Sequence, residues 1–309
     1  MRILRPGSSG EFADSWVLVY GLGMIGSAIT DALCRLGYEI HSDIPFDWNN
    51  AAQRQRAEQQ IMATCAASAP SEGKLSVVWS AGEAAFHSTE KEVALEQAVF
   101  NQSIETLKHL RESIKPSRFV FHFISSAGGL FEGQRVVGPD SRPAPKRPYG
   151  QLKLAQEQAL LAKFEARELA IYRPSSVYGP MQQNARKGLI NNLVNNGRSG
   201  RVTVLEAHVM SLRDYVFSHD IGNFVARCIR SGVFNDAPGP ERFLVSARCS
   251  SILEVVRKIQ RILKLNLRVR YDENFGNNRS ITFNERVLPA GWNPVTLDVG
   301  LRQFLVGAS

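Results

Sequence analysis

The chain reads WVLVYGLGMIG at residues 16–26, a short apolar run followed directly by a glycine-rich turn. Such a run is typical of a strand buried on both faces of a parallel sheet. In GxGxxG between strand and helix, the first glycine permits a tight turn, the second lets a phosphate approach, and the third lets the helix pack closely. The stretch predicts a dinucleotide site with these cofactor-contacting residues: Gly21, Gly23, Met24, Ile25 and Gly26.

Strand-like and helix-like segments alternate beyond this turn. Apolar runs at residues 75–79 and 119–124 resemble the first one. The helix candidates are residues 24–36, 51–66, 91–113 and 151–165. This alternation is typical of βαβ units. We therefore expect an α/β fold, a Rossmann doubly wound parallel sheet with a smaller interleaved C-terminal substrate-binding region.

The regular alternation of strand-like and helix-like segments is lost after residue 179, which suggests that the two parts of the chain have different roles. We expect residues 1–179 to form the dinucleotide-binding domain, with returning strands from about 212–246, and residues 180–309 to be mainly substrate-binding. Residues 133–147 are rich in Pro, Gly and Arg and have no periodicity, so they predict a surface loop or lid beside the site.

Composition limits the classes of function. The 309 residues are 44% hydrophobic, as in globular proteins, and contain no apolar run long enough to cross a membrane. Without an apolar leader, we expect a cytoplasmic protein. The net charge of +8 permits an anionic ligand, but no nucleic-acid motif accompanies it. The cysteines and histidines lack metal-ligand spacing, so we expect no metal.

Tyr149 and Lys153 form a YxxxK pair at the start of a helix candidate. Their spacing puts both side chains on one face, one turn apart. A phenol with an ordinary pKa near 10 is a poor base, and a nearby ammonium favours its ionised form. Ser126 follows a strand candidate, at the end where open α/β sheets bind ligands. Its hydroxyl can stabilise charge on a reacting oxygen.

Asp43 follows the strand candidate 38–42 and lies 17 residues after the last glycine of the turn. A carboxylate there accepts hydrogen bonds from the adenosine ribose and repels a 2′-phosphate. No Lys or Arg lies between Arg35 and Arg54. NAD is therefore favoured and NADP is the alternative. Asp47 is the competing carboxylate.

These motifs, in this order, resemble the extended short-chain dehydrogenase/reductases, the NAD-dependent epimerase/dehydratase family of nucleotide-sugar enzymes such as UDP-galactose 4-epimerase. The similarity covers residues 16–305 and includes FISSAGG at 123–129, YRPSSVYGP at 172–180 and LRDYVFSHDI at 212–221. It implies that Ser126, Tyr149 and Lys153 are catalytic, with Lys153 also holding the nicotinamide ribose. Further cofactor contacts implied are Ser80, Ala81, Gly82, Asn101, Tyr149, Lys153 and Pro174. Substrate contacts implied are Ser126, Tyr149, Ser176 and Arg213.

For Arg213, the resemblance implies a contact with the substrate diphosphate, and a surface ion pair with Asp214 is the alternative. The family also implies a homodimer formed through the helices at 91–113 and 151–165.

The residues after Ser126 narrow the reaction. Family dehydratases place acidic residues there, whereas this chain has Ala127, Gly128 and Gly129, which carry no proton. We expect a nucleotide-sugar epimerase acting at C4, with small residues leaving space for the sugar to turn. A reductase of a 4-keto nucleotide sugar is the first alternative. A non-catalytic dinucleotide sensor or scaffold is the second.

Overall fold

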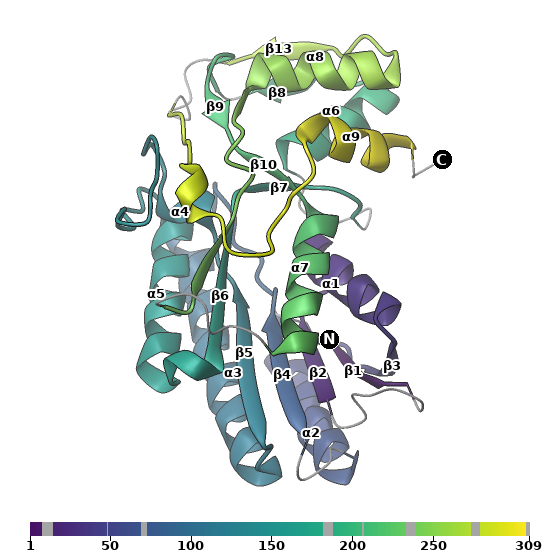
Figure 1. Cartoon of the computed structure of the whole chain (residues 1–309), viewed down its shortest axis with the longest axis vertical. Coiled ribbons are helices and arrows are strands. Elements are labelled where there is room, and N and C mark those ends of the chain that lie inside the picture. The colour runs from purple at the N-terminus through teal and green to yellow at the C-terminus, as the bar shows by residue number, and fades with distance from the viewer. Residues whose placement is uncertain are drawn as a thin grey trace.

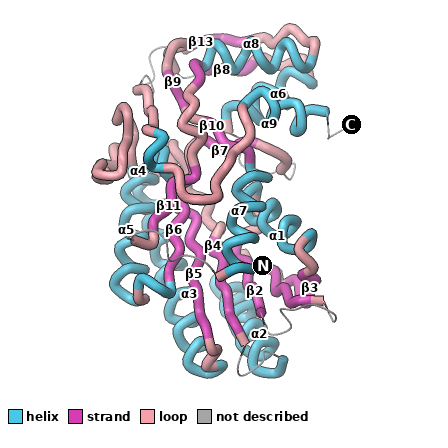
Figure 2. The backbone as a smooth tube through the Cα atoms, viewed as in Figure 1, coloured by secondary structure: helices cyan, strands magenta, loops and turns pink. Residues whose placement is uncertain are grey.

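A seven-stranded sheet forms the centre of the protein (Figures 1 and 2). The structure is a computed structural model, and it describes residues 1–7, 15–47, 49–68, 73–181, 188–205, 207–232, 239–272 and 279–306. Within them the strand order is β11-β6-β5-β4-β2-β1-β3. Five neighbouring strands run parallel: β2 (Ser15–Tyr20), β4 (Lys74–Trp79), β5 (Arg118–Ile124), β6 (Leu169–Pro174) and β11 (Glu241–Leu244). The expected α/β fold is confirmed.

Helices cover both faces of this sheet because its central strands β2, β4, β5 and β6 are buried on both sides. One face packs against α1 (Met24–Arg35) and α7 (Ser218–Ser231). The other face packs against three helices: α2 (Ala51–Ser68), α3 (Glu90–Ile114) and α5 (Pro148–Lys163). Figure 1 shows α1 and α7 side by side, away from α3 and α5. None of the described helices is long and apolar enough to cross a bilayer.

An antiparallel strand, which the sequence analysis did not anticipate, separates β2 from β3 (Tyr38–Asp43). This strand is β1 (Arg2–Pro6), and Arg2 pairs with Val19 on one side and with Asp43 on the other. Neighbouring strands lie about 4.8 Å apart, so the end of β3 lies about 10 Å from β2. The expected segment 38–42 is a strand, but it does not lie beside the strand that carries the glycine turn.

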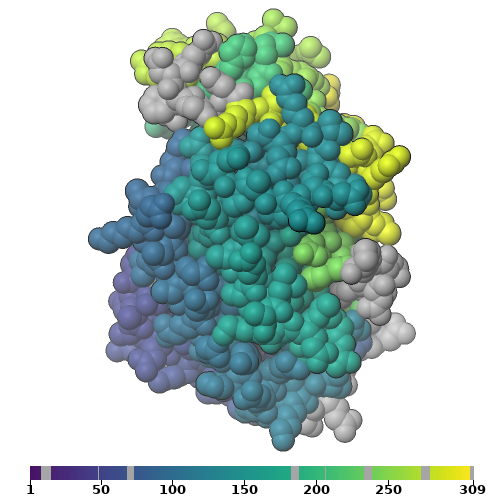
Figure 3. Space-filling view, turned by 90° about the vertical axis from the view of Figure 1, so that its left-hand side faces the viewer, coloured from purple at the N-terminus to yellow at the C-terminus, as the bar shows by residue number. Residues whose placement is uncertain are grey.

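A smaller lobe lies beyond the carboxyl ends of β5 and β6, at the top of Figures 1 and 3. Its strands form three pairs: β7 (Ser176–Tyr178) with β10 (Tyr215–Phe217), β9 (Leu212–Arg213) with β12 (Ser250–Ser251), and β8 (Thr203–Leu205) with β13 (Val269–Tyr271). Its helices are α6 (Leu189–Arg198), α8 (Ile252–Leu263) and α9 (Leu297–Val306), which share a core of their own.

The chain passes between the sheet and this lobe more than once. The short helix α4 (Ala127–Leu130) follows β5, and single 3-10 turns occupy Ala166–Glu168 and Glu285–Val287. Of the segments expected to return to the sheet, β11 joins its edge, whereas β9 and β10 pair outside it. Residues 133–147 contain no helix or strand until Pro148 begins α5.

His122 in the middle of β5 is fully buried. Its Nδ1 lies 3.1 Å from the hydroxyl of Tyr172 on β6, and burial lowers the pKa of its imidazole to about 3. The folded protein therefore holds this ring neutral at a pH where the unfolded chain takes up a proton.

This difference predicts a stability that depends on pH. Because the folded pKa is depressed, the free energy of unfolding falls as the pH falls from about 6.5 towards 3. Between pH 7.5 and 5, the native protein should lose about 2 kcal/mol more than His122→Gln. Urea unfolding at both pH values measures this. His109→Gln, at an exposed histidine, should keep the native slope, and an equal slope in His122→Gln would contradict the assignment.

Candidate active site

Close backbone packing shapes the glycine turn between β2 and α1. Gly21 has φ +82°, and a Cβ there would lie 2.4 Å from the Cα of Ala81. A Cβ on Gly26 would lie 1.8 Å from the carbonyl oxygen of Gly21. The Ser80 hydroxyl lies 2.9 Å from the Tyr20 carbonyl oxygen and 2.7 Å from that of Gly21, as a donor. Ser80 therefore supports the turn, and its expected cofactor contact stays a prediction.

The middle glycine of the turn faces open space. A Cβ on Gly23 would meet no heavy atom within 4 Å, and Gly23 caps α1 without a side-chain hydrogen bond. The first turn of α1 carries no acidic residue, so its free N–H groups and partial positive charge are available to an anion. This is the cradle that a dinucleotide diphosphate requires.

Tyr149 lies in the first turn of α5, which begins at Pro148 rather than at residue 151 as expected. Proline suits this position because its missing N–H would have no partner there. A Cβ on Gly129 would lie 3.1 Å from Cε1 of the Tyr149 ring, and a Cβ on Gly150 would lie 2.3 Å from the Gly129 oxygen. Both glycines are thus needed for α4 and α5 to pack in contact.

Ser126 also lies against Gly129. It caps α4, and its Oγ accepts a hydrogen bond of 3.0 Å from the Gly129 amide. Since Gly129 touches both the Ser126 hydroxyl and the Tyr149 ring, the structure brings these two predicted residues together at the carboxyl end of β5. A Cβ on Gly128 would meet only the Ser126 Oγ, at 3.9 Å. The open side of this site is therefore at Gly128, because the Tyr149 ring already fills the space beside Gly129.

Lys153 is buried one turn further along α5. Its Nζ lies 5.9 Å from the Tyr149 ring centroid, 3.1 Å from Oε1 of Gln156 and 3.9 Å from Oε1 of Glu96. Sequence reasoning missed both acceptors. Gln156 follows Lys153 at the i+3 spacing of a helix face, which could have indicated it. Glu96 comes from α3, and no local pattern connects it to Lys153.

The other predicted cofactor residues fall into two groups. Ala81 and Gly82 line the loop after β4, where Gly82 has φ +137°. Asn101 instead lies on an exposed part of α3, where its Oδ1 accepts a hydrogen bond of 2.9 Å from Gln97. Asp43 forms an ion pair of 3.2 Å with Arg2 of β1. No Lys or Arg lies between Arg35 and Arg54 in the sequence, but β1 brings the Arg2 guanidinium to Asp43.

Arg213 does not form the ion pair with Asp214 that was its alternative. The Asp214 carboxylate is buried and accepts hydrogen bonds from Ser175 and from the backbone and hydroxyl of Ser246. The Arg213 guanidinium donates to the carbonyl oxygens of Leu212, at 3.0 Å, and of Arg279. Burial lowers its pKa. Backbone carbonyl oxygens, and not the Asp214 carboxylate, therefore orient the Arg213 guanidinium.

The turn after β6 carries the remaining predicted residues. Pro174 ends β6, and the amide of Ser176 donates a hydrogen bond of 3.1 Å to the carbonyl oxygen of Asp214. This contact joins the turn to the segment that carries Arg213.

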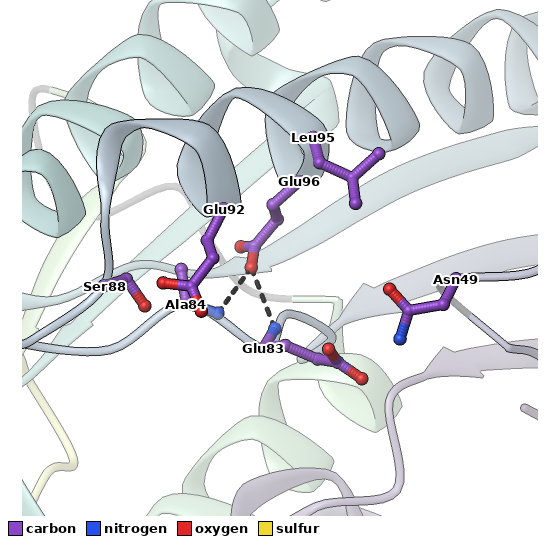
Figure 4. Close-up of a pocket in the computed structure, with 7 residues that line it drawn as sticks. All are labelled: Asn49, Glu83, Ala84, Ser88, Glu92, Leu95 and Glu96. Atoms are coloured by element: carbon purple, nitrogen blue, oxygen red, sulfur yellow. Dashed lines mark hydrogen bonds between the residues drawn. The ribbon is translucent and has the colours of Figure 1, made fainter.

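A cavity of about 150 Å³ lies between the loop after β4 and the start of α3 (Figure 4). Its lining residues are Asn49, Glu83, Ala84, Ser88, Glu92, Leu95 and Glu96. Glu96 belongs both to this cavity and to the surroundings of Lys153. Among the described residues, no cluster of His, Cys, Asp and Glu could hold a metal ion.

Comparison with known proteins gives a family and a fold. The protein-family model described as "NAD dependent epimerase/dehydratase family" matches residues 17–240 of this chain. A comparison with curated proteins gives no match.

Solved structures of similar fold include UDP-glucose 4-epimerases from Thermotoga maritima, with UDP-glucose, and from Thermus thermophilus, with NAD. The first is 20% identical, with TM-score 0.71 over 94% of this chain and 97% of that one. The second is 17% identical, with TM-score 0.73 over the same shares. The UDP-glucuronic acid 4-epimerase from Bacillus cereus, with UDP-glucuronic acid and NAD, is 18% identical, with TM-score 0.69 over 95% and 99%.

The geometry of the glycine turn predicts a large loss of stability for one alanine substitution and a small change for another. Gly26→Ala forces a side chain onto the Gly21 carbonyl and should lower the free energy of unfolding by at least about 2 kcal/mol. Gly23→Ala enters open space and should change it by less than about 1 kcal/mol. Chemical denaturation compares them, and equal losses would contradict this geometry.

Proposed function

The chain belongs to the NAD-dependent epimerase/dehydratase family, and we propose that this enzyme epimerises a nucleotide-diphosphate sugar at C4 of the sugar. The observation that carries the proposal is the packing around Gly129, which lies against both the Ser126 hydroxyl and the Tyr149 ring, with the buried Lys153 one turn further along α5. UDP-sugars and NAD occupy solved structures of the same fold, which supports this substrate class and cofactor.

The turn at Gly23 suits the diphosphate of NAD, since it presents open space and the unpaired amides of α1. When bound, NAD supplies a hydride acceptor that can return the hydride. Asp43 would have to share its carboxylate between Arg2 and the adenosine ribose. We propose NAD as the cofactor. NADP stays the alternative, since the Arg2 guanidinium could pair with its 2′-phosphate.

Three residues of this chain then have separate roles in the reaction. Tyr149 takes the proton from the C4 hydroxyl as the carbon is oxidised and gives it back when the keto sugar is reduced from its other face. Ser126 donates a hydrogen bond to the same oxygen, where charge develops. Lys153 holds a positive charge near the phenol and towards the nicotinamide ribose. The open side at Gly128 is where a turning sugar ring would fit.

Dehydration is disfavoured because the residues that follow Ser126 offer no free acid. The nearest carboxylate along the chain, Glu132, is buried and forms ion pairs with Arg147 at 3.2 Å and Arg279 at 3.8 Å. Ala127 and the two glycines after it have no side chain that can donate or accept a proton. A net reductase would consume NADH or NADPH in each turnover, whereas an epimerase would return its NAD unchanged, so a requirement for added reduced cofactor distinguishes the two.

A homodimer and a cytoplasmic location remain parts of this proposal. The exposed Leu95 of α3 and Leu161 of α5 are compatible with pairing through these two helices. The Glu105–Lys163 ion pair joins the helices within one chain.

Replacing the phenol tests the catalytic assignment. Tyr149→Phe should lower kcat about 100- to 10,000-fold, because it removes the proton carrier, and should change NAD affinity far less than kcat. Turnover is measured on UDP-, GDP- and dTDP-sugars with added NAD or NADPH. Tyr271→Phe, at an exposed tyrosine of β13, is the matched control. Native turnover in Tyr149→Phe would refute the assignment.

Replacing the arginine tests the substrate site. Arg213→Ala should weaken binding of the nucleotide sugar by about 1.5–3 kcal/mol, the scale of a charge-assisted hydrogen bond. Isothermal titration with the sugar nucleotide and with the free nucleoside diphosphate measures this loss. Arg230→Ala, at an exposed arginine of α7, should bind normally. Unchanged affinity of Arg213→Ala for the free diphosphate would remove Arg213 from the site.

A further inference from the structure

Glu96 places a buried carboxylate between two parts of the proposed site. It lies on the buried face of α3, and its side chain is 6% exposed. Its Oε2 accepts hydrogen bonds from the amides of Glu83, at 2.8 Å, and Ala84, at 2.7 Å. Figure 4 shows this carboxylate pointing from the helix onto the loop after β4. One oxygen therefore fixes the loop that carries the predicted cofactor residues Ala81 and Gly82.

The other oxygen of Glu96 faces the predicted catalytic lysine. Oε1 lies 3.9 Å from Nζ of Lys153, whose side chain is 7% exposed. It is buried and accepts no hydrogen bond from a described residue. A Cβ on Gly82 would lie only 2.5 Å from this oxygen, so glycine at position 82 is what allows the carboxylate to reach Lys153.

Lys153 needs such partners because its stem is long and its ammonium is buried. A buried charge without a partner is costly, and a lysine stem with four rotatable bonds can direct its head in many ways. Gln156 accepts one hydrogen bond at 3.1 Å and Glu96 attracts the ammonium from the opposing helix. Gln156 takes one of the three donor protons of the ammonium, and the attraction of Glu96 limits how the head group can turn.

We propose that Glu96 is a positioning residue, which holds the Lys153 ammonium and the loop at 82–84 in the arrangement that binds the nicotinamide ribose. The proposal rests on the dinucleotide site of the proposed function. It assigns to α3 a part in cofactor binding through a residue that contacts Lys153.

The variant Glu96→Gln isolates the charge. Its amide oxygen can still accept from Glu83 and Ala84, so the loop keeps its anchor while Lys153 loses its carboxylate. Titration calorimetry should show NAD binding weakened about 10-fold. Affinity for ADP, which lacks the nicotinamide ribose, should stay within about 2-fold of native. An equal loss for ADP and NAD would mean that Glu96 only supports the fold and would overturn the proposal.

Glu92→Gln is the matched control. Glu92 lines the same cavity and caps α3 through its contact with the Thr89 amide, which a glutamine oxygen can retain. It should bind NAD like the native protein. If Glu92→Gln weakens NAD as much as Glu96→Gln, the effect comes from the net charge of the cavity, and the proposal fails.

A double-mutant cycle with Lys153→Met shows whether Glu96 acts through the lysine. In the Lys153→Met background, Glu96→Gln should change NAD affinity less than about 2-fold, because the partner is gone. A full 10-fold loss there would overturn the proposal. If Glu96→Gln does not fold, Glu96→Asp takes its place. It keeps the charge with a shorter reach, and the loss of NAD affinity that it causes should be smaller beside Lys153→Met than in the native background.

The two proposals fail in different ways. If Glu96 and Lys153 are coupled in NAD binding but the protein turns over no nucleotide sugar, the proposed reaction is wrong and the role of Glu96 stands. Normal turnover with an additive cycle overturns only the role of Glu96. A native protein that binds no dinucleotide overturns both.

Discussion

The contact of Gly26 with the Gly21 carbonyl is the constraint on which the site depends. It lets α1 begin directly above the end of β2, and the hydroxyl of Ser80, the residue after β4, holds the ends of β2 and β4 together. The amides at the start of α1 then face open space at Gly23 instead of a side chain. A second close contact, between Gly129 and Gly150, sets Tyr149 beside Ser126 at the end of β5. Both contacts exist because no Cβ is present.

The sequence predicted those parts of the structure that depend on local pattern. The buried strands β2, β4 and β5 follow from apolar runs, and α1 follows from the glycine turn. Tyr149 and Lys153 could be paired because helical spacing alone places them on one face. Even here the start of α5 was misplaced, because Pro148 reads as a loop residue in the sequence and serves as the first residue of the helix.

What could not be predicted comes from contacts between distant segments. The strand β1 is short, and only its pairing with both β2 and β3 shows that Arg2 reaches Asp43. Likewise, Glu96 and Lys153 are far apart in the chain and meet only because α3 and α5 pack on the same face of the sheet. The structure thus brings Ser126, Tyr149 and Lys153 to one end of β5, and their catalytic roles stay predictions, whereas β1 changes the surroundings of Asp43.

The central claim is that Tyr149 would exchange a proton with a sugar held beside the nicotinamide of bound NAD. Near-ultraviolet absorbance of the NAD-loaded protein, followed while nucleotide sugars are added, tests it most directly. The account predicts that one of them produces a reduced-nicotinamide absorbance that rises and then decays as its C4 epimer appears. Epimer formation without any such absorbance under rapid mixing, or no response to any nucleotide sugar, would contradict it.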